Sequence, residues 1–280
     1  GSRAGIDTYN YGSGALTITT ANVTGTASVG IGAANYGTNL TINSAAGAVS
    51  GTTGVFASNY GLGALSITTA NVTGTASDGI IARNSVNGTN LAVNTTAGTV
   101  VGRANGITAT NAGAGSLTIT SAGVTGTTGT GILATVASTT TGLTITTSGT
   151  VTGALVGIDA RNNSASATTI VNNGTITAGS REAIRASTSA NALITNNGRI
   201  EGFVTLGAGN DRLTNTGTFA AIGNSNFGAG TDLLTNSGTF LVQGASPVSV
   251  TGLESFANSG RIELANGVPL GGGVFRIYLP

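Results

Sequence analysis

The sequence contains no cysteine, histidine, lysine, methionine or tryptophan, and only three prolines in 280 residues. Without cysteine there is no disulfide framework and no thiolate metal site. Without histidine or cysteine, the usual general base and the strongest nucleophile are also missing. Charged residues make up 7% of the chain, ten arginines against nine acids. A nearly neutral chain lacks the concentrated basic surface that nucleic acid requires, so we expect no nucleic-acid partner.

The chain consists instead of a repeat of small and β-branched residues, and residues 65–82 contain its clearest copy. Each copy has three short apolar segments that alternate inward and outward residues as strands do. The second segment has the form Val-x-Gly, and the third is glycine followed by an aliphatic residue. The first segment begins at Leu16, Leu40, Leu65, Leu91, Leu117 and Leu143, at steps of 24 to 26 residues. Three strands per turn predict an all-β parallel β-helix of about a dozen rungs, spaced ~4.8 Å apart.

An asparagine follows the third segment in nearly every long rung. It occurs at Asn10, Asn35, Asn59, Asn84, Asn111 and Asn162, and Val136 takes its place in the one exception. Asparagines stacked at one corner can satisfy turn amides and bond to one another. We therefore expect this column to be structural.

The repeat changes near residue 170, where Asn-x-Gly replaces Val-x-Gly and the leucine steps shorten to 20. Five charged residues precede position 141 and fourteen follow it. We expect one continuous domain, with long rungs over 3–168, shorter rungs over 169–265 and a C-terminal strand or cap over 266–280. Residues 1–2 are interpreted as a cloning scar, so no targeting signal is expected to be visible here.

Two candidate binding features follow from this register. Tyr11, Tyr36 and Tyr60 each come between the column asparagine and a glycine, so they should stack at one corner of the first rungs. Aromatic rings there would bind sugar faces or a partner protein, or would pack on each other and cover the end of the coil.

Counting back four residues from the later asparagines places Asp211, Asp232 and Glu254 in one slot. Like carboxylates on neighbouring rungs repel unless they are solvated, paired with arginine or bridged by a cation. Residues 207–213 and 228–234 resemble the glycine–aspartate calcium repeats of RTX proteins. They lack the leading glycine, however, and recur every 21 residues instead of every nine. The alternatives are a calcium site and turn-forming aspartates, and no other cofactor is expected.

Two further functions follow from other patterns. The outward positions of the first segment form a Thr-x-Thr array, for example Thr17/Thr19 and Thr118/Thr120, which is what an ice-binding face would look like. A β-helix carbohydrate-active enzyme would need acids gathered on one face. Asp7 and Asp159 share a slot but lie six rungs apart, roughly 29 Å by the strand spacing, which is too far for a working carboxylate pair.

The Leu-Thr-Ile-Thr rungs, residues 236–240 and residues 204–211 resemble the passenger domains of bacterial autotransporters. The resemblance covers nearly the whole chain, but it is one of repeat style and composition, without a diagnostic short motif. It implies a right-handed β-helix on the surface of a Gram-negative bacterium, tethered to the outer membrane through a C-terminal barrel that this sequence lacks.

We therefore expect a non-enzymatic adhesin or stalk. Its partners would be host-cell or matrix proteins or glycans, or neighbouring bacterial cells. Ice binding is the alternative, and a carbohydrate-active enzyme is the third possibility.

Overall fold

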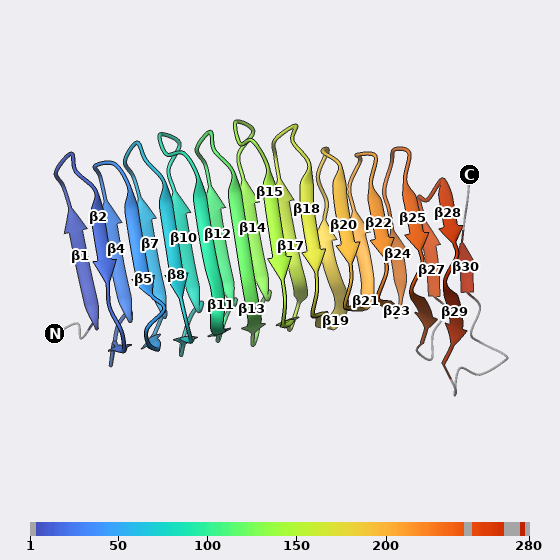
Figure 1. The fold of residues 1–280 in the computed structure, drawn as a ribbon, viewed down its shortest axis with the longest axis horizontal. Coiled ribbons are helices and arrows are strands. Elements are labelled where there is room, and N and C mark those ends of the chain that lie inside the picture. The colour runs from blue at the N-terminus through green and yellow to red at the C-terminus, as the bar shows by residue number, and fades with distance from the viewer. Residues whose placement is uncertain (1–3, 244–247, 266–274, 278–280) are drawn as a thin grey trace.

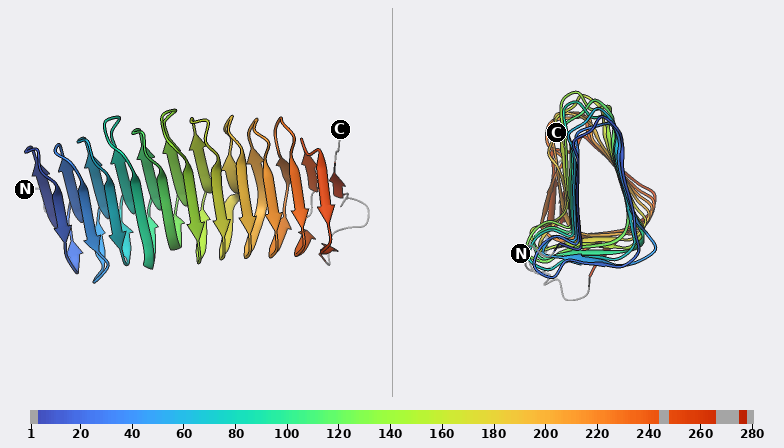
Figure 2. Two further views of the ribbon diagram at one scale, coloured as in Figure 1. Left: turned by 45° about the horizontal axis from the view of Figure 1, so that its top comes forward. Right: turned by 90° about the vertical axis from the view of Figure 1, so that its left-hand side faces the viewer.

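The computed structural model describes residues 4–243, 248–265 and 275–277. The chain forms a right-handed parallel β-helix with three faces, coiled from the N-terminal end to the C-terminal end (Figure 1). Seen along its axis, the coil has three sides with loops at the corners (Figure 2). The predicted fold class is therefore confirmed.

Each strand pairs in parallel with the equivalent strand one turn away, so each face is a ladder of successive rungs. The first face contains β1 (Ile6–Asn10), β4 (Ile31–Asn35), β7 (Val55–Asn59), β10 (Ile80–Asn84), β12 (Ile107–Asn111), β14 (Ile132–Val136), β17 (Val156–Asn162), the second halves of β19 (Thr175–Ala186) and β21 (Arg199–Leu206), β24 (Asn224–Asn226), β27 (Val248–Thr251) and β30 (Phe275–Ile277). These twelve strand segments span eleven turns.

The second face carries the leucine segment. It contains β2 (Leu16–Thr19), β5 (Leu40–Ser44), β8 (Leu65–Thr69), the first halves of β11 (Leu91–Gly102) and β13 (Leu117–Gly126), β15 (Leu143–Thr147), β18 (Thr168–Asn172), β20 (Ala192–Asn196), β22 (Arg212–Asn215), β25 (Leu233–Asn236) and β28 (Ser255–Asn258).

The third face carries the Val-x-Gly segment. It contains β3 (Val23–Thr24), β6 (Val49–Gly51), β9 (Val72–Gly74), the second halves of β11 and β13, β16 (Thr150–Gly153), the first halves of β19 and β21, β23 (Thr218–Ala221), β26 (Thr239–Val242) and β29 (Arg261–Leu264).

The register places like residues above like, as the repeat predicts. On the second face Leu40 pairs with Leu65, and Leu65 pairs with Leu91. The first two inward positions of most second-face strands are aliphatic, and most of these side chains are fully buried. Each such side chain contributes roughly 1.5–3 kcal/mol relative to an exposed one. The core is therefore a set of aliphatic columns that run along the axis.

The asparagine column forms one hydrogen-bonded chain from Asn10 to Asn111, and Val136 separates Asn162 from it. The amide Nδ2 of each asparagine donates to Oδ1 of the next, at 2.7 Å from Asn10 to Asn35 and 3.1 Å from Asn84 to Asn111. The same nitrogens also donate to corner carbonyls, such as Gly63 O for Asn59. A second chain runs through Asn172, Asn196, Asn215, Asn236 and Asn258 at 2.6–2.7 Å. Both columns are structural.

In the rung of β21, the corner between the third face and the first face is reduced to a single bend. β21 passes from the third face to the first without a loop, and it turns at Gly202, whose φ is 132°. A Cβ on this residue would lie 2.1 Å from the carbonyl oxygen of Arg181, so only glycine fits. The ladders themselves continue through this region, since β18 pairs with β20 and β19 with β21.

Part of the expected chain ends lies outside the described residues. This applies to the scar at residues 1–2 and to most of the cap at 266–280. Within that cap, β30 pairs in parallel with β27 and adds a rung to the first face. In the part of the chain that the structure describes, no helix has the length and apolar character needed to cross a membrane.

Replacing Asn84 by alanine tests the first asparagine chain. The change removes the acceptor of Asn59 Nδ2 and the donor to Asn111 Oδ1 inside a buried column. We expect the free energy of unfolding to fall by about 1–3 kcal/mol in urea denaturation. Asn10→Ala is the matched control, because Asn10 is only partly buried and has one column neighbour; we expect less than about 1 kcal/mol there. Equal losses at the two positions would contradict a cooperative column.

Candidate functional site

The predicted tyrosine stack forms at the corner between the first and second faces. The ring centroids of Tyr11 and Tyr36 are 5.2 Å apart, and those of Tyr36 and Tyr60 are 4.8 Å apart, with planes within 20° of parallel. The rings therefore contact one another, as offset aromatic pairs do. About half or more of each side chain is still exposed, and Tyr11 is exposed most, at 75%. The column ends at Ser85, whose hydroxyl donates to the carbonyl of Tyr60.

A fourth ring belongs to this surface and was missed from the sequence. Tyr9 lies 6.2 Å from Tyr11 with its plane tilted by only 7°. Its side chain points outward from β1, the strand that also contains Asn10, and is 57% exposed. Strand alternation from the inward Asn10 would have placed Tyr9 on the outer face beside the stack.

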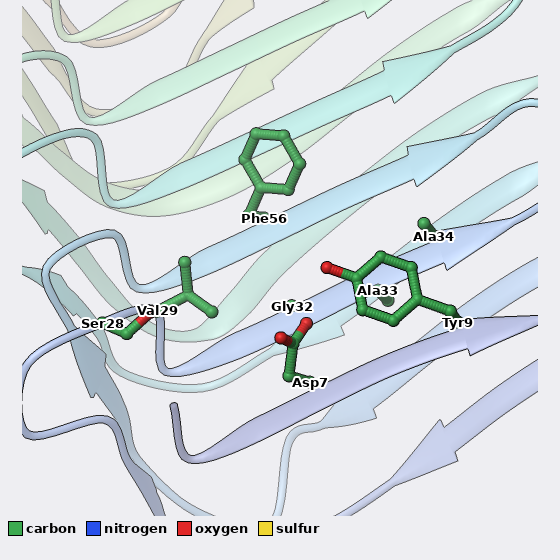
Figure 3. A pocket seen from close by; sticks show the side chains of 8 residues that line it. All are labelled: Asp7, Tyr9, Ser28, Val29, Gly32, Ala33, Ala34 and Phe56. Carbon is green, nitrogen blue, oxygen red and sulfur yellow. The ribbon is translucent and has the colours of Figure 1, made fainter. Parts of the chain in front are cut away.

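A pocket of about 180 Å³ lies beside Tyr9 on the outer face of the first three rungs. Asp7 and Tyr9 of β1 lie on one side of it, and Phe56 of β7 lies on the other (Figure 3). Gly32 and Ala34 of β4, in the rung between, form its floor, and the loop residue Val29 closes one end. Gly32 has no side chain, so a gap is left between the neighbouring side chains of its column.

Charge is distributed unevenly around this pocket. The negative charge of Asp7 raises the pKa of the Tyr9 hydroxyl above its ordinary value. Of the arginines in the described part of the chain, none forms an ion pair with Asp7. The guanidinium of Arg83 lies 5.6 Å from the ring centroid of Phe56, within the range of a cation–π contact. The pocket thus has a carboxylate at one end and, at the other, an aromatic ring in cation–π contact with an arginine.

The acidic slot has a different geometry from the one expected. Asp211, Asp232 and Glu254 occupy the column that begins with the inward-facing leucines of the second face. Asp211 and Asp232 are each only 1% exposed. Neither arginine pairing nor solvent compensates their charge, so two of the three expected means of relieving repulsion are not used.

Backbone amides fill that role. In the long rungs the first N–H of each second-face strand donates to a corner carbonyl, as Leu65 does to Asn90. In the short rungs a carboxylate oxygen replaces this carbonyl. Asp211 Oδ1 accepts from the amide of Ala192 at 2.7 Å, and Asp232 Oδ1 accepts from Asp211 at 2.6 Å. Glu254 continues the series by accepting from Asp232.

This arrangement leaves the acids poorly solvated. Oδ2 of Asp211 and of Asp232 has no hydrogen-bond partner. Burial raises the pKa of Asp211 to about 6; the negative charge of Asp232 adds to the rise, and the bond from Ala192 opposes it. Burial also raises the pKa of Asp232. Asp211 and Asp232 therefore act as buried strand-end acceptors, and the partly buried Glu254 continues the series.

Calcium binding at this column stays a prediction. Its carboxylates are directed along the axis to the amides of adjacent rungs and do not converge on one point. Among residues 4–243, 248–265 and 275–277, no group of three or more histidine, cysteine, aspartate or glutamate side chains is arranged to hold a metal ion.

Asp159 also differs from its predicted surroundings. It shares a column with Asp7, six rungs away, as the repeat predicts. Its carboxylate is buried and bonds to Arg161 at 2.8 Å and Arg185 at 3.5 Å, while Arg185 also pairs with Glu182. This ion-pair cluster was not expected. It neutralises an acid in the sheet face.

The pH dependence of stability tests the acid column through Asp211→Asn. Asparagine keeps the oxygen that accepts from Ala192 but cannot ionise. The wild-type carboxyl is protonated in the folded state up to about pH 6, whereas the unfolded carboxyl loses its proton near its ordinary pKa of 3.8. Wild-type stability should therefore fall relative to Asp211→Asn by roughly 1–3 kcal/mol as pH rises from 4 to 7.

Urea midpoints at four pH values would measure this difference. Asp211→Ala provides the comparison, because it leaves the Ala192 amide without an acceptor and should be less stable than Asp211→Asn by about 1–3 kcal/mol at every pH. A wild-type stability that rises relative to Asp211→Asn between pH 4 and 7 would refute the buried arrangement.

No protein-family model matches the chain, and no curated protein or solved structure is similar enough to count as a match. The structure shows a β-solenoid. This fold is compatible with an autotransporter passenger domain.

Proposed function

We propose that this protein is a non-enzymatic adhesive rod displayed on a bacterial cell surface. The observation that carries the proposal is the unbroken axial register. All three faces pair turn upon turn from β1 to β29 in the part of the chain that the structure describes. A chain built in this way is stiff and elongated, and can hold a binding surface away from a membrane.

The interior supports rigidity and offers little chemistry. Its inward positions are mostly aliphatic, and its buried polar side chains are mostly serine, threonine and asparagine, with most of the asparagines in hydrogen-bonded columns. Asp7 and Asp159 lie six rungs apart, too far for a working carboxylate pair, and Asp159 forms ion pairs with two arginines. These features favour a stalk over a carbohydrate-active enzyme.

The aromatic surface lies at the N-terminal end of the rod. Tyr9, Tyr11, Tyr36 and Tyr60 gather on the first three rungs, whereas charge accumulates toward the other end. The resemblance to autotransporter passengers implies an anchor C-terminal to this chain. An anchor there would hold the tyrosines farthest from the membrane, where a host cell or neighbouring bacterium is met first. Many weak contacts from many copies would then give useful avidity.

Ice binding remains the second candidate, because the outward threonines of the second face are in register. Thr17 pairs with Thr41, and Thr118 with Thr144. Asn43 and Asn94 interrupt the array, and each accepts a hydrogen bond from an amide two residues later. Arg212 adds a charge to the outward column that contains Thr17, Thr41, Thr118 and Thr144. The array is thus less uniform than a repeating ice-binding face would require.

Adhesion can be measured with beads coated with the full chain and applied to host epithelial cells and to bacterial cells. We expect binding about tenfold above albumin-coated beads, and loss of most of it in a triple Tyr11→Ala, Tyr36→Ala, Tyr60→Ala variant. The matched control replaces Thr118, Thr144 and Thr169 by alanine on another face and should bind like wild type.

Binding no better than that of albumin beads on either cell type would contradict the proposal. Thermal hysteresis by the same preparation would instead favour the ice-binding alternative. Release of sugar from polysaccharide would favour the enzyme.

A further inference from the structure

We propose that the pocket formed by Asp7, Tyr9, Gly32 and Phe56 binds a single sugar ring of a cell-surface glycan. This inference deepens the proposed adhesive function and rests on it for its biological setting. The binding itself depends only on the pocket.

The pocket exists because one column lacks one side chain. The outward column from Asp7 to Thr205 contains a single glycine, and every other position carries a side chain. Its members are Asp7, Gly32, Phe56, Ile81, Thr108, Leu133, Asp159, Arg185 and Thr205. A Cβ on Gly32 would lie 2.8 Å from Asp7 Oδ1 and 3.0 Å from Val29 Cγ2. The absence of that atom keeps the floor open.

The dimensions suit one ring. Asp7 and Tyr9 lie two rungs from Phe56, roughly 9–10 Å by the strand spacing. The volume of about 180 Å³ is below the range of roughly 300–1,000 Å³ that is usual for drug-sized ligands. The pocket therefore has room for one pyranose, with the rest of a glycan chain outside it.

The lining has the two properties that a sugar ring requires. Tyr9 and Phe56 supply aromatic faces, which carry partial negative charge and attract the weakly positive C–H groups of a sugar's apolar side. Asp7 supplies carboxylate oxygens, which accept hydrogen bonds from sugar hydroxyls more strongly than neutral acceptors do. In Figure 3 the Asp7 carboxylate and the Tyr9 hydroxyl lie close together beside Gly32, so both can reach one edge of a ring.

A neutral ring is favoured over an organic cation. Asp7 and two aromatic rings alone would also attract a quaternary ammonium group. Arg83, however, already places a guanidinium over Phe56, and a second cation on that ring would be repelled. A neutral ligand meets no such repulsion.

Saturation-transfer difference NMR with the methyl glycosides of glucose, galactose, mannose and N-acetylglucosamine tests the pocket. We expect at least one glycoside to show transfer to its ring protons, with a Kd on the order of 1 mM, as suits a shallow single-ring site. Gly32→Val, which fills the floor, and Phe56→Ala, which removes a wall, should each weaken binding about tenfold or more.

Leu133→Ala is the matched control, because Leu133 occupies the same column three rungs beyond Phe56 and outside the pocket. It should bind like wild type. Urea midpoints of the variants show whether each is folded; valine at position 32 suits an outward strand position, so a folded protein is expected. Asp7→Asn should weaken binding while leaving the pocket open.

Three results would overturn the proposal: no transfer to any glycoside, equal binding by wild type and Gly32→Val, or binding of tetramethylammonium in preference to every sugar. The adhesion assay separates this failure from failure of the proposed function. Beads carrying Gly32→Val that still adhere like wild type would disprove the pocket's part in adhesion alone. Sugar binding without adhesion would disprove the adhesive function alone.

Discussion

The structure depends on the parallel backbone ladder between each strand and its equivalent one turn later. Because neighbouring rungs are ~4.8 Å apart, every residue lies directly on the residue at the same position of the next turn. A position is therefore stable only if its side chain packs or bonds well with a near-copy of itself. Leucine, isoleucine and valine do so in the core, asparagine does so at the corners through Nδ2 and Oδ1, and tyrosine does so by ring stacking.

Positions where a side chain does not stack on a similar one are the positions where the structure departs from a uniform rod. Carboxylates cannot stack favourably, and the column through Asp211 and Asp232 is stable only because each acid accepts a backbone amide in place of a lost corner carbonyl. Gly32 is the opposite exception, since it leaves a gap between larger neighbours and so creates the pocket. Binding chemistry on a regular solenoid is expected at such interruptions, because uniform columns present only a repeated polar surface.

Much of this could be predicted from the sequence, since the repeat gives both the strands and their register. The leucine ladder, the Asn10 column and the stacked Tyr11, Tyr36 and Tyr60 were all predicted and are present. The slot shared by Asp211 and Asp232 was also predicted, but its inward direction was not. Thr168 and Ala192 separate these acids from the leucines of the same column, and the shortened rungs hide the continuity.

The pocket was missed for a related reason. Its walls come from three rungs, and Gly32 is distinguished from the many turn glycines only when its column is read across turns. The Gly30-Ile31-Gly32 sequence, with a second glycine where other rungs have a side chain, was the available signal. Register could be read from the repeat, whereas a cavity depends on several columns at once.

The axial register is tested most directly by double electron–electron resonance between pairs of introduced cysteines, since the chain has none of its own. Thr41, Thr118, Thr144, Thr169 and Leu193 share one outward column of the second face. Spin labels at Thr41→Cys combined in turn with each of the other four positions should give narrow distances that lengthen by about 4.8 Å per rung. The Thr41–Leu193 pair, six rungs apart, should reach roughly 29 Å. Broad distributions, or distances that do not increase with rung number, would contradict the continuous stacked rod.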